Sequence, residues 1–283
     1  MTSQTGRSAV TALVEQWGPD AAVGAVDGTG NRVIWSDDAS TYPLASVSKL
    51  ITALGCLVAI EEGTLGLDAP AGPPGSTVRH LLAHASGLDF DGATVLAAPG
   101  ERRIYSNTGF ELLAEELEVA SGIAWQDYLR EAVVEPLGMS HTVIGGSAAR
   151  SFSGTLSDLI ALGSELLAPT LISKSTWVEA TTVQFGDLDG VLPGFGTQRP
   201  NPWGLGFEIK GAKAPHWTGR LNSARAFGHF GSSGAFLWVD PDLGLSLVAL
   251  GRRDFGDWAL ELWPRLADTV IGERFAGGGR RSR

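Results

Sequence analysis

The sequence predicts an α+β fold, in which one antiparallel sheet is built from both ends of the chain, is flanked by helices and is interrupted by an all-helical middle lobe. Strand patterns occur at 21–37 and again at 203–251, whereas the residues from 46 to about 170 follow a helical pattern. No internal repeat is visible, which argues against a repeat architecture.

The length of 283 residues is long for one compact core and short for two independent ones. We therefore expect 1–283 to form a single domain with two lobes. Residues 1–45 and 200–283 are expected to form the sheet lobe, and residues 46–199 the mainly helical lobe. A cleft between lobes is a common place for a functional site.

The first strands follow an amphipathic helix. This helix covers 8–17 and ends before Gly18 and Pro19, and the apolar runs 21–27 and 31–37 flank a glycine turn, which predicts a hairpin. A long helix is expected from Ser46 to Glu62, because Gly63 follows it. Further helices are predicted near Thr77 and at 110–122, 125–138 and 155–168.

Strand patterns return after a glycine- and proline-rich passage at 186–202. They lie at 203–211, 225–231, 234–240 and 245–251, with a turn at 241–244, and a last helix is predicted at 257–275.

Composition excludes several classes of protein. A hydrophobic content of 43% with 18% charged residues is typical of a globular chain, and a net charge of −10 argues against binding nucleic acid. No apolar run reaches the ~18 residues of a membrane span, and the first twenty residues lack the apolar core of a secretory signal. The single Cys56 has no disulfide partner. We expect a cytoplasmic protein, and a frayed basic tail at the end of the chain.

Residues 42–54, "YPLASVSKLITAL", place two serines and a lysine at the start of the long helix. Residues three apart share a helix face, so Ser46 and Lys49 can touch across the first turn, whereas Ser48 and Lys49 point apart. Free backbone N–H groups at a helix start favour negative charge on the Ser46 oxygen. A neutral Lys49 could then remove the hydroxyl proton. Alone, this spacing is more typical of a capping serine followed by a solvated lysine.

Further motifs follow in order: "VRHLLAHASGL", "PGERRIYSNTGFELLAEELEVASG", "EPLGM" and "GHFGSSGAFLWVDPDLGLSLVAL". Together with residues 45–70 they resemble the serine β-lactamase and penicillin-binding-protein-like superfamily. The resemblance is closest to the branch of class C β-lactamases, related esterases and D-amino-acid peptidases, and covers nearly three quarters of the chain. It implies a β-lactamase/transpeptidase-like fold and no cofactor.

The resemblance also implies roles for individual residues. Ser46 corresponds to the acylated nucleophile, Lys49 to its proton partner and Tyr105 to a general base or acid. Asn107 would hydrogen-bond the acyl side chain of the substrate. In the third motif, His229 would face the cleft, Gly231 would let the substrate backbone approach, and the N–H groups of Ser232 and Ser46 would bind the oxyanion.

One position departs from the family pattern. Phe230 stands where lactamases and DD-peptidases of this superfamily usually carry threonine, whose hydroxyl helps to hold the substrate carboxylate. A phenyl ring cannot donate that bond, which favours an esterase-like activity. Three functions stay open: a serine hydrolase of small esters or amides, a β-lactamase or D-Ala-D-Ala carboxypeptidase or D-aminopeptidase, and a non-catalytic ligand sensor. The oligomeric state is left open.

Other candidate signals are weaker. His80 and His84 are spaced like metal ligands on a helix, but no third ligand is evident and the resemblance makes them structural. We therefore expect no metal site. Arg103, Arg220 and Arg225 could bind an acid group but are expected to be surface residues.

Overall fold

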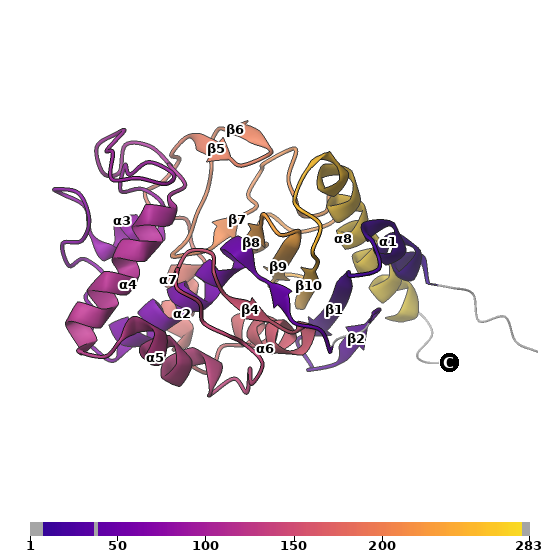
Figure 1. Cartoon of the computed structure of the whole chain (residues 1–283). Coiled ribbons are helices and arrows are strands. Elements are labelled where there is room, and N and C mark those ends of the chain that lie inside the picture. Colours follow the sequence, from indigo (N-terminus) through magenta and orange to yellow (C-terminus); the bar gives the residue numbers. More distant parts are fainter. Residues whose placement is uncertain (1–7, 37–38, 279–283) are drawn as a thin grey trace, which may run out of the picture.

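The computed structural model describes residues 8–36 and 39–278, and it shows a mixed α+β architecture (Figure 1). The expected basic tail at 280–283 lies outside the described residues, as do residues 1–7, which belong to the segment that lacks the apolar core of a secretory signal. In the part of the chain that is described, no helix is both long and apolar enough to cross a membrane.

The central sheet has six strands in the order β2-β1-β10-β9-β8-β7, and every pair is antiparallel. The N-terminal strand β1 pairs along its whole length with the last strand β10, so the sheet is built from both ends of the chain as predicted. The strands are β1 (Ala22–Asp27), β2 (Arg32–Ile34), β7 (Glu208–Ile209), β8 (Phe227–Gly231), β9 (Ala235–Asp240) and β10 (Leu245–Leu250). The runs predicted at 31–37 and 203–211 therefore contribute only three and two residues to the sheet.

Each face of the sheet packs against its own group of helices. Along β9, Phe236 and Trp238 belong to the apolar cluster under α1 (Ala9–Trp17) and α8 (Asp257–Gly278). The alternate residues Leu237 and Val239 belong to the larger cluster on the opposite face. This alternation is the period of two expected for a strand buried on both faces. Figure 1 shows α1 and α8 side by side, away from the other helices.

The larger cluster surrounds α2 (Ser48–Glu61), whose residues from Ser48 to Ala59 are all buried. A helix that is buried on every side carries no polar face, which fits its central position. The other helices are α3 (Val78–Leu82), α4 (Asn107–Ser121), α5 (Trp125–Leu129), which continues into a π-helical turn (Arg130–Val134), α6 (Leu156–Leu167) and α7 (Lys174–Ala180).

Two expectations need correction. The α-helix begins at Ser48 and not at Ser46, because Ala45–Val47 form a 3₁₀ turn that precedes it. The middle of the chain is mainly but not entirely helical: β4 (Ser153–Gly154) pairs with β3 (Tyr42–Pro43), and β5 (Gly190–Leu192) pairs with β6 (Gly196–Gln198). The first pair gives the segment before Ser46 a backbone partner, and the second is a hairpin within the glycine-rich passage.

Candidate active site

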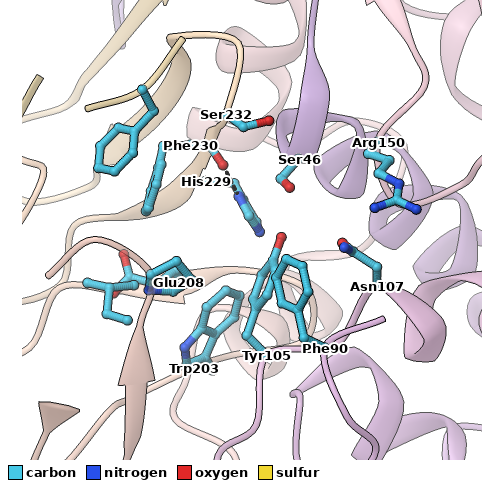
Figure 2. Close-up of a pocket in the computed structure, with 13 residues that line it drawn as sticks. Ser46, Phe90, Tyr105, Asn107, Arg150, Trp203, Glu208, His229, Phe230 and Ser232 are labelled. Carbon is cyan, nitrogen blue, oxygen red and sulfur yellow. Dashed lines mark hydrogen bonds between the residues drawn. The ribbon is translucent and has the colours of Figure 1, made fainter. Parts of the chain in front are cut away.

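A cavity of about 300 Å³ opens at the end of β8, between the sheet and the helical part of the molecule (Figure 2). Five of the seven residues predicted for the site line it. The other two are close behind its wall, since Lys49 contacts Ser46 and Gly231 packs against the backbone of that serine. The lining residues are Ser46, Phe90, Tyr105, Asn107, Arg150, Leu192, Pro193, Trp203, Glu208, His229, Phe230, Ser232 and Phe255.

Ser46 is presented by a strained turn. Ala45 has a φ of 45°, a left-handed conformation that costs a residue with a Cβ about 1–2 kcal/mol. The turn leaves Ser46 partly exposed in the cavity, whereas Ser48 is fully buried. The Ser48 hydroxyl accepts a hydrogen bond from the backbone N–H of Phe152 at 3.1 Å. Of the two serines, Ser46 is therefore the one that a substrate can reach.

Lys49 lies under Ser46 and is completely buried. Its Nζ is 3.5 Å from the Ser46 Oγ, 2.6 Å from the Asn107 Oδ1 and 2.9 Å from the carbonyl oxygen of Ala149. It also lies 4.8 Å from the centre of the Tyr105 ring. Burial holds the pKa of the amine well below its ordinary value, and the nearby Glu111 carboxylate offsets part of this effect.

The contacts of Lys49 suit an uncharged amine. A neutral amine has two N–H donors and one lone pair. The amide oxygen of Asn107 and the carbonyl of Ala149 can only accept, so each takes one N–H. When the amine is neutral, its lone pair is left for the third neighbour, the Ser46 hydroxyl 3.5 Å away, which can then donate to it. In this arrangement the amine can accept the proton of Ser46.

The side chain of Tyr105 also faces Ser46 (Figure 2). Figure 2 shows its hydroxyl pointing towards the Ser46 hydroxyl, and it makes no hydrogen bond with any described residue. Burial raises the pKa of this phenol above its ordinary value, and the nearby Ser46 hydroxyl partly offsets the rise. Tyr105 therefore stays protonated and is suited to donate or relay a proton rather than to act as a resting base.

Asn107 lines the cavity and is held by two contacts within the protein. Its Oδ1 accepts from Lys49, and its Nδ2 donates to the Asp91 carboxylate at 3.0 Å. Both ends of the amide are therefore engaged within the protein, and only one N–H remains for a substrate.

His229 is buried beside Tyr105 and Trp203, with ring centres 5.7 and 5.6 Å apart. Its Nδ1 lies 2.7 Å from the Phe230 carbonyl oxygen, so this nitrogen carries the proton and Nε2 is left as an acceptor without a partner among the described residues. Burial, together with the nearby Lys49, lowers the pKa of the imidazole to about 3. His229 is thus uncharged and can accept a hydrogen bond, but it adds no positive charge to the cavity.

Gly231 lies in close contact with the turn that carries Ser46. A Cβ at this position would lie 2.6 Å from the Leu44 carbonyl oxygen and 3.0 Å from the Ser46 backbone nitrogen. The glycine therefore allows the end of β8 to pack against the turn that carries Ser46. This close packing brings the following residue, Ser232, to the same cavity as Ser46.

One side of the cavity is apolar. Phe230 lines it with Leu192, Pro193 and Phe255, and its ring lies 5.1 Å from that of Phe255. Because no hydroxyl stands at this position, this wall binds a hydrocarbon group better than a carboxylate.

Sequence reasoning missed several residues around the site. Phe90, Arg150, Trp203 and Glu208 line the cavity but carry no motif that marks them. Arg103 was expected at the surface, yet it is buried and donates to the carbonyls of Ala83, Gln184 and Asn201. These loop carbonyls replace water around its charge.

His80 and His84 do not form a metal cluster, and the described residues contain no group of three or more potential metal ligands. The Nδ1 of His84 accepts the backbone N–H of Ser106, and its ring lies 4.5 Å from that of Tyr105. The Nδ1 of His80 accepts the N–H of Thr77 at the start of α3. Both histidines thus have packing and capping contacts.

Comparison with known proteins agrees with this geometry. The family model described as Beta-lactamase matches residues 14–270. A crystal structure of a beta-lactamase from Mycobacterium bovis is 51% identical and superimposes with a TM-score of 0.90, covering 93% of this chain and 98% of the other.

Two curated relatives match over shorter lengths. The penicillin-binding protein 4* of Bacillus subtilis is 35% identical over 36% of this chain and 30% of its own length. The D-alanyl-D-alanine-carboxypeptidase/endopeptidase AmpH of Escherichia coli is 27% identical over 50% of this chain and 48% of its own length. The chain thus spans less than half the length of these two relatives. The match of the family model over nearly the whole chain shows that the chain belongs to the beta-lactamase family of serine hydrolases.

Proposed function

We propose that the protein hydrolyses a small carboxylic ester or amide through an acyl-enzyme on Ser46. The observation that carries this proposal is the Lys49 amine, which is buried, has two fixed acceptors and is 3.5 Å from the Ser46 hydroxyl. Lys49 accepts the hydroxyl proton as the Ser46 Oγ bonds to the substrate carbonyl carbon. The backbone N–H groups of Ser46 and Ser232 stabilise the resulting oxyanion.

The leaving group departs as its bond to the carbonyl carbon breaks. It takes a proton from Tyr105, which is replenished from Lys49, so no net charge accumulates in the buried site. Water then attacks the carbonyl carbon of the acyl-enzyme and gives a proton to Tyr105, which passes its own proton to Lys49. Lys49 returns this proton to the Ser46 Oγ as the ester bond breaks, and the acid is released. Each step uses groups that already face the cavity or lie directly beneath it, and no cofactor takes part.

The preferred substrate in this proposal is an ester with an apolar group. Phe230, Phe255 and Leu192 offer that group a hydrocarbon surface, and the neutral His229 adds no charge to attract a carboxylate. This supports an esterase-like activity over the cleavage of substrates that carry a carboxylate beside the scissile bond.

A β-lactamase or D-Ala-D-Ala carboxypeptidase activity, or a D-aminopeptidase activity, is the second candidate. Arg150 favours it, because this half-exposed cation lines the cavity close to Asn107 and could receive an anionic group. The names of the matched relatives point the same way. A non-catalytic ligand sensor is the third, and the intact lysine contacts argue against it.

A substrate panel separates these candidates. Turnover of p-nitrophenyl acetate and butyrate, nitrocefin and D-alanine amides would be measured with the wild type and with Ser46→Ala. We expect ester turnover that exceeds lactam and amide turnover and disappears in Ser46→Ala. Dominant nitrocefin or D-alanine amide turnover would favour the second candidate. Ester turnover that survives in Ser46→Ala would contradict the proposed nucleophile.

A further inference from the structure

The two acceptors of the Lys49 amine are both held by carboxylates that lie further from Ser46. The first acceptor is the amide of Asn107, whose opposite end donates to the Asp91 Oδ1 at 3.0 Å. Asp91 therefore fixes which end of the amide faces Lys49. An amide turned the other way would offer N–H groups to the amine and would lose the acceptor.

The second acceptor, the Ala149 carbonyl, belongs to the segment 147–150, in which every residue is tethered. The Ser147 hydroxyl and the Ala148 N–H both donate to the Glu111 carboxylate, which lies one turn after Asn107 on α4. The Ala148 carbonyl accepts from Thr52 on α2 at 2.8 Å. Arg150 closes the arrangement with an ion pair of 3.0 Å to Asp91.

We propose that Asp91, Glu111 and Arg150, acting with the segment 147–150, form a clamp that fixes both acceptors of the Lys49 amine and so keeps its third position on the Ser46 hydroxyl. These are positioning residues, because none of the contacts described above joins them to Ser46. The inference rests on the proposed function of Ser46 and Lys49. It assigns roles to Asp91 and Arg150, which lie outside every motif of the sequence, and to Glu111, to which the motifs gave no role.

The clamp also places both negative and positive charges near the Lys49 amine. The carboxylates of Asp91 and Glu111 stabilise a protonated Lys49, and the guanidinium of Arg150 destabilises it. The remaining titratable groups near the amine are uncharged, because Tyr105 keeps its proton and burial lowers the pKa of both His84 and His229. Changing one charge in the clamp therefore shifts the protonation of Lys49 in a direction that follows from its sign.

The test is the pH dependence of kcat/KM for p-nitrophenyl butyrate, whose acid limb reports the base of the free enzyme. Arg150→Met removes a cation and should move the acid limb to higher pH. Asp91→Asn and Glu111→Gln remove anions and should move it to lower pH. We expect shifts of about 0.3–1 pH unit, the size of a Coulomb interaction through partly solvated protein.

A separate variant tests positioning. Asp91→Ala removes the acceptor of the Asn107 amide, and we expect it to lower kcat about tenfold or more with little change in KM. The more conservative Asp91→Asn keeps an acceptor oxygen and should recover part of this loss. Asp91 and Arg150 are 42% and 52% exposed, so their variants carry the test even if Glu111→Gln fails to fold.

Two exposed residues of matching charge serve as controls. Glu115 is exposed one turn after Glu111 on α4 and has the same charge, and Arg102 is exposed and has the same charge as Arg150. Neither residue has a described contact with the clamp. Glu115→Gln and Arg102→Met should therefore leave the acid limb of kcat/KM unmoved. The clamp is wrong if turnover still depends on Ser46 but the acid limb of kcat/KM moves in none of the clamp variants, or moves in the same direction in all of them. Turnover that does not depend on Ser46 would instead overturn the proposed function.

Discussion

Gly231 packs directly against Ser46, so that a Cβ on this glycine would lie 3.0 Å from the Ser46 backbone nitrogen and 2.9 Å from the Cβ of Ala45. These neighbours belong to the turn that holds Ala45 in its left-handed conformation. The strained turn and the end of β8 therefore fit together only if residue 231 has no side chain. The contact links the sheet to the position of Ser46, the proposed nucleophile.

Gly231→Ala should push the Ala45–Val47 turn, which carries Ser46, away from β8. We expect a loss of ester turnover of about a hundredfold or more, because small displacements of reacting groups are costly, and a lower midpoint of thermal unfolding. Gly146→Ala is the matched control, since a Cβ there would meet no atom within 4 Å. Equal activity of the two variants would show that the close packing at Gly231 does not position Ser46.

Ser48→Ala should separate structure from chemistry in the two-serine turn. It leaves the buried N–H of Phe152 without its acceptor, which should cost about 1–3 kcal/mol of unfolding free energy in urea titrations. Turnover of p-nitrophenyl butyrate by the folded variant should persist. Abolished turnover in a stably folded Ser48→Ala would indicate that the wrong serine has been assigned.

Tyr105→Phe should lower kcat for esters by about 10²–10⁴-fold, the usual range for a lost proton-transfer group. The unfolding free energy should not fall, because the deleted hydroxyl is buried and makes no hydrogen bond with the described residues. Tyr128→Phe is a control of the opposite kind: its hydroxyl bonds the Glu62 carboxylate at 2.6 Å, so stability should fall and kcat should not.

Phe230→Thr should change substrate preference. The new hydroxyl should raise nitrocefin turnover relative to p-nitrophenyl butyrate turnover by about tenfold or more. The lost ring should cost about 2–4 kcal/mol, since it packs against Phe255 and Trp263. Phe195→Thr, which also removes a ring next to Phe230 but does not line the cavity, should lower stability without changing the ratio. An unchanged ratio in Phe230→Thr would remove the argument for an esterase-like preference.

His229 should make the protein sensitive to acid. The unfolded chain binds a proton at this residue below about pH 6.5, whereas the folded protein, in which the pKa of His229 is about 3, does not until that lower pH. Stability is therefore lost as the pH falls from 6.5 to about 3. His229→Gln should flatten this part of the unfolding free energy against pH, measured by urea titration at several pH values. If the unfolding free energy of His229→Gln has the same slope against pH as that of the wild type, then protonation of this histidine does not destabilise the folded protein.

The fold could be predicted because its signals are local. Continuous apolar runs between glycine-containing turns marked β9 and β10, and Gly63 marked the end of α2. The short strands were overestimated, because the apolar pattern at 203–211 reflects burial in a loop for most of its length. Burial alone does not distinguish a strand from a packed loop.

The site was only partly predictable. The spacing of Ser46 and Lys49 predicts that the two side chains meet across one helical turn. The 3₁₀ turn and the positive φ of Ala45 could not be predicted, because the turn packs against β8, which lies almost two hundred residues later. Asp91 and Arg150 could not be found either. They belong to loops whose meeting is set by tertiary packing, and neither has a characteristic neighbour in the sequence.

The most direct test of the central claim is intact-mass measurement after exposure to a fluorophosphonate, followed by peptide mapping. A serine activated by Lys49 should gain one adduct, located on Ser46, within minutes. Lys49→Ala should react slower by orders of magnitude, and Ser46→Ala should gain no mass. Full labelling of Ser46→Ala, or an adduct on another serine of the wild type, would contradict the account.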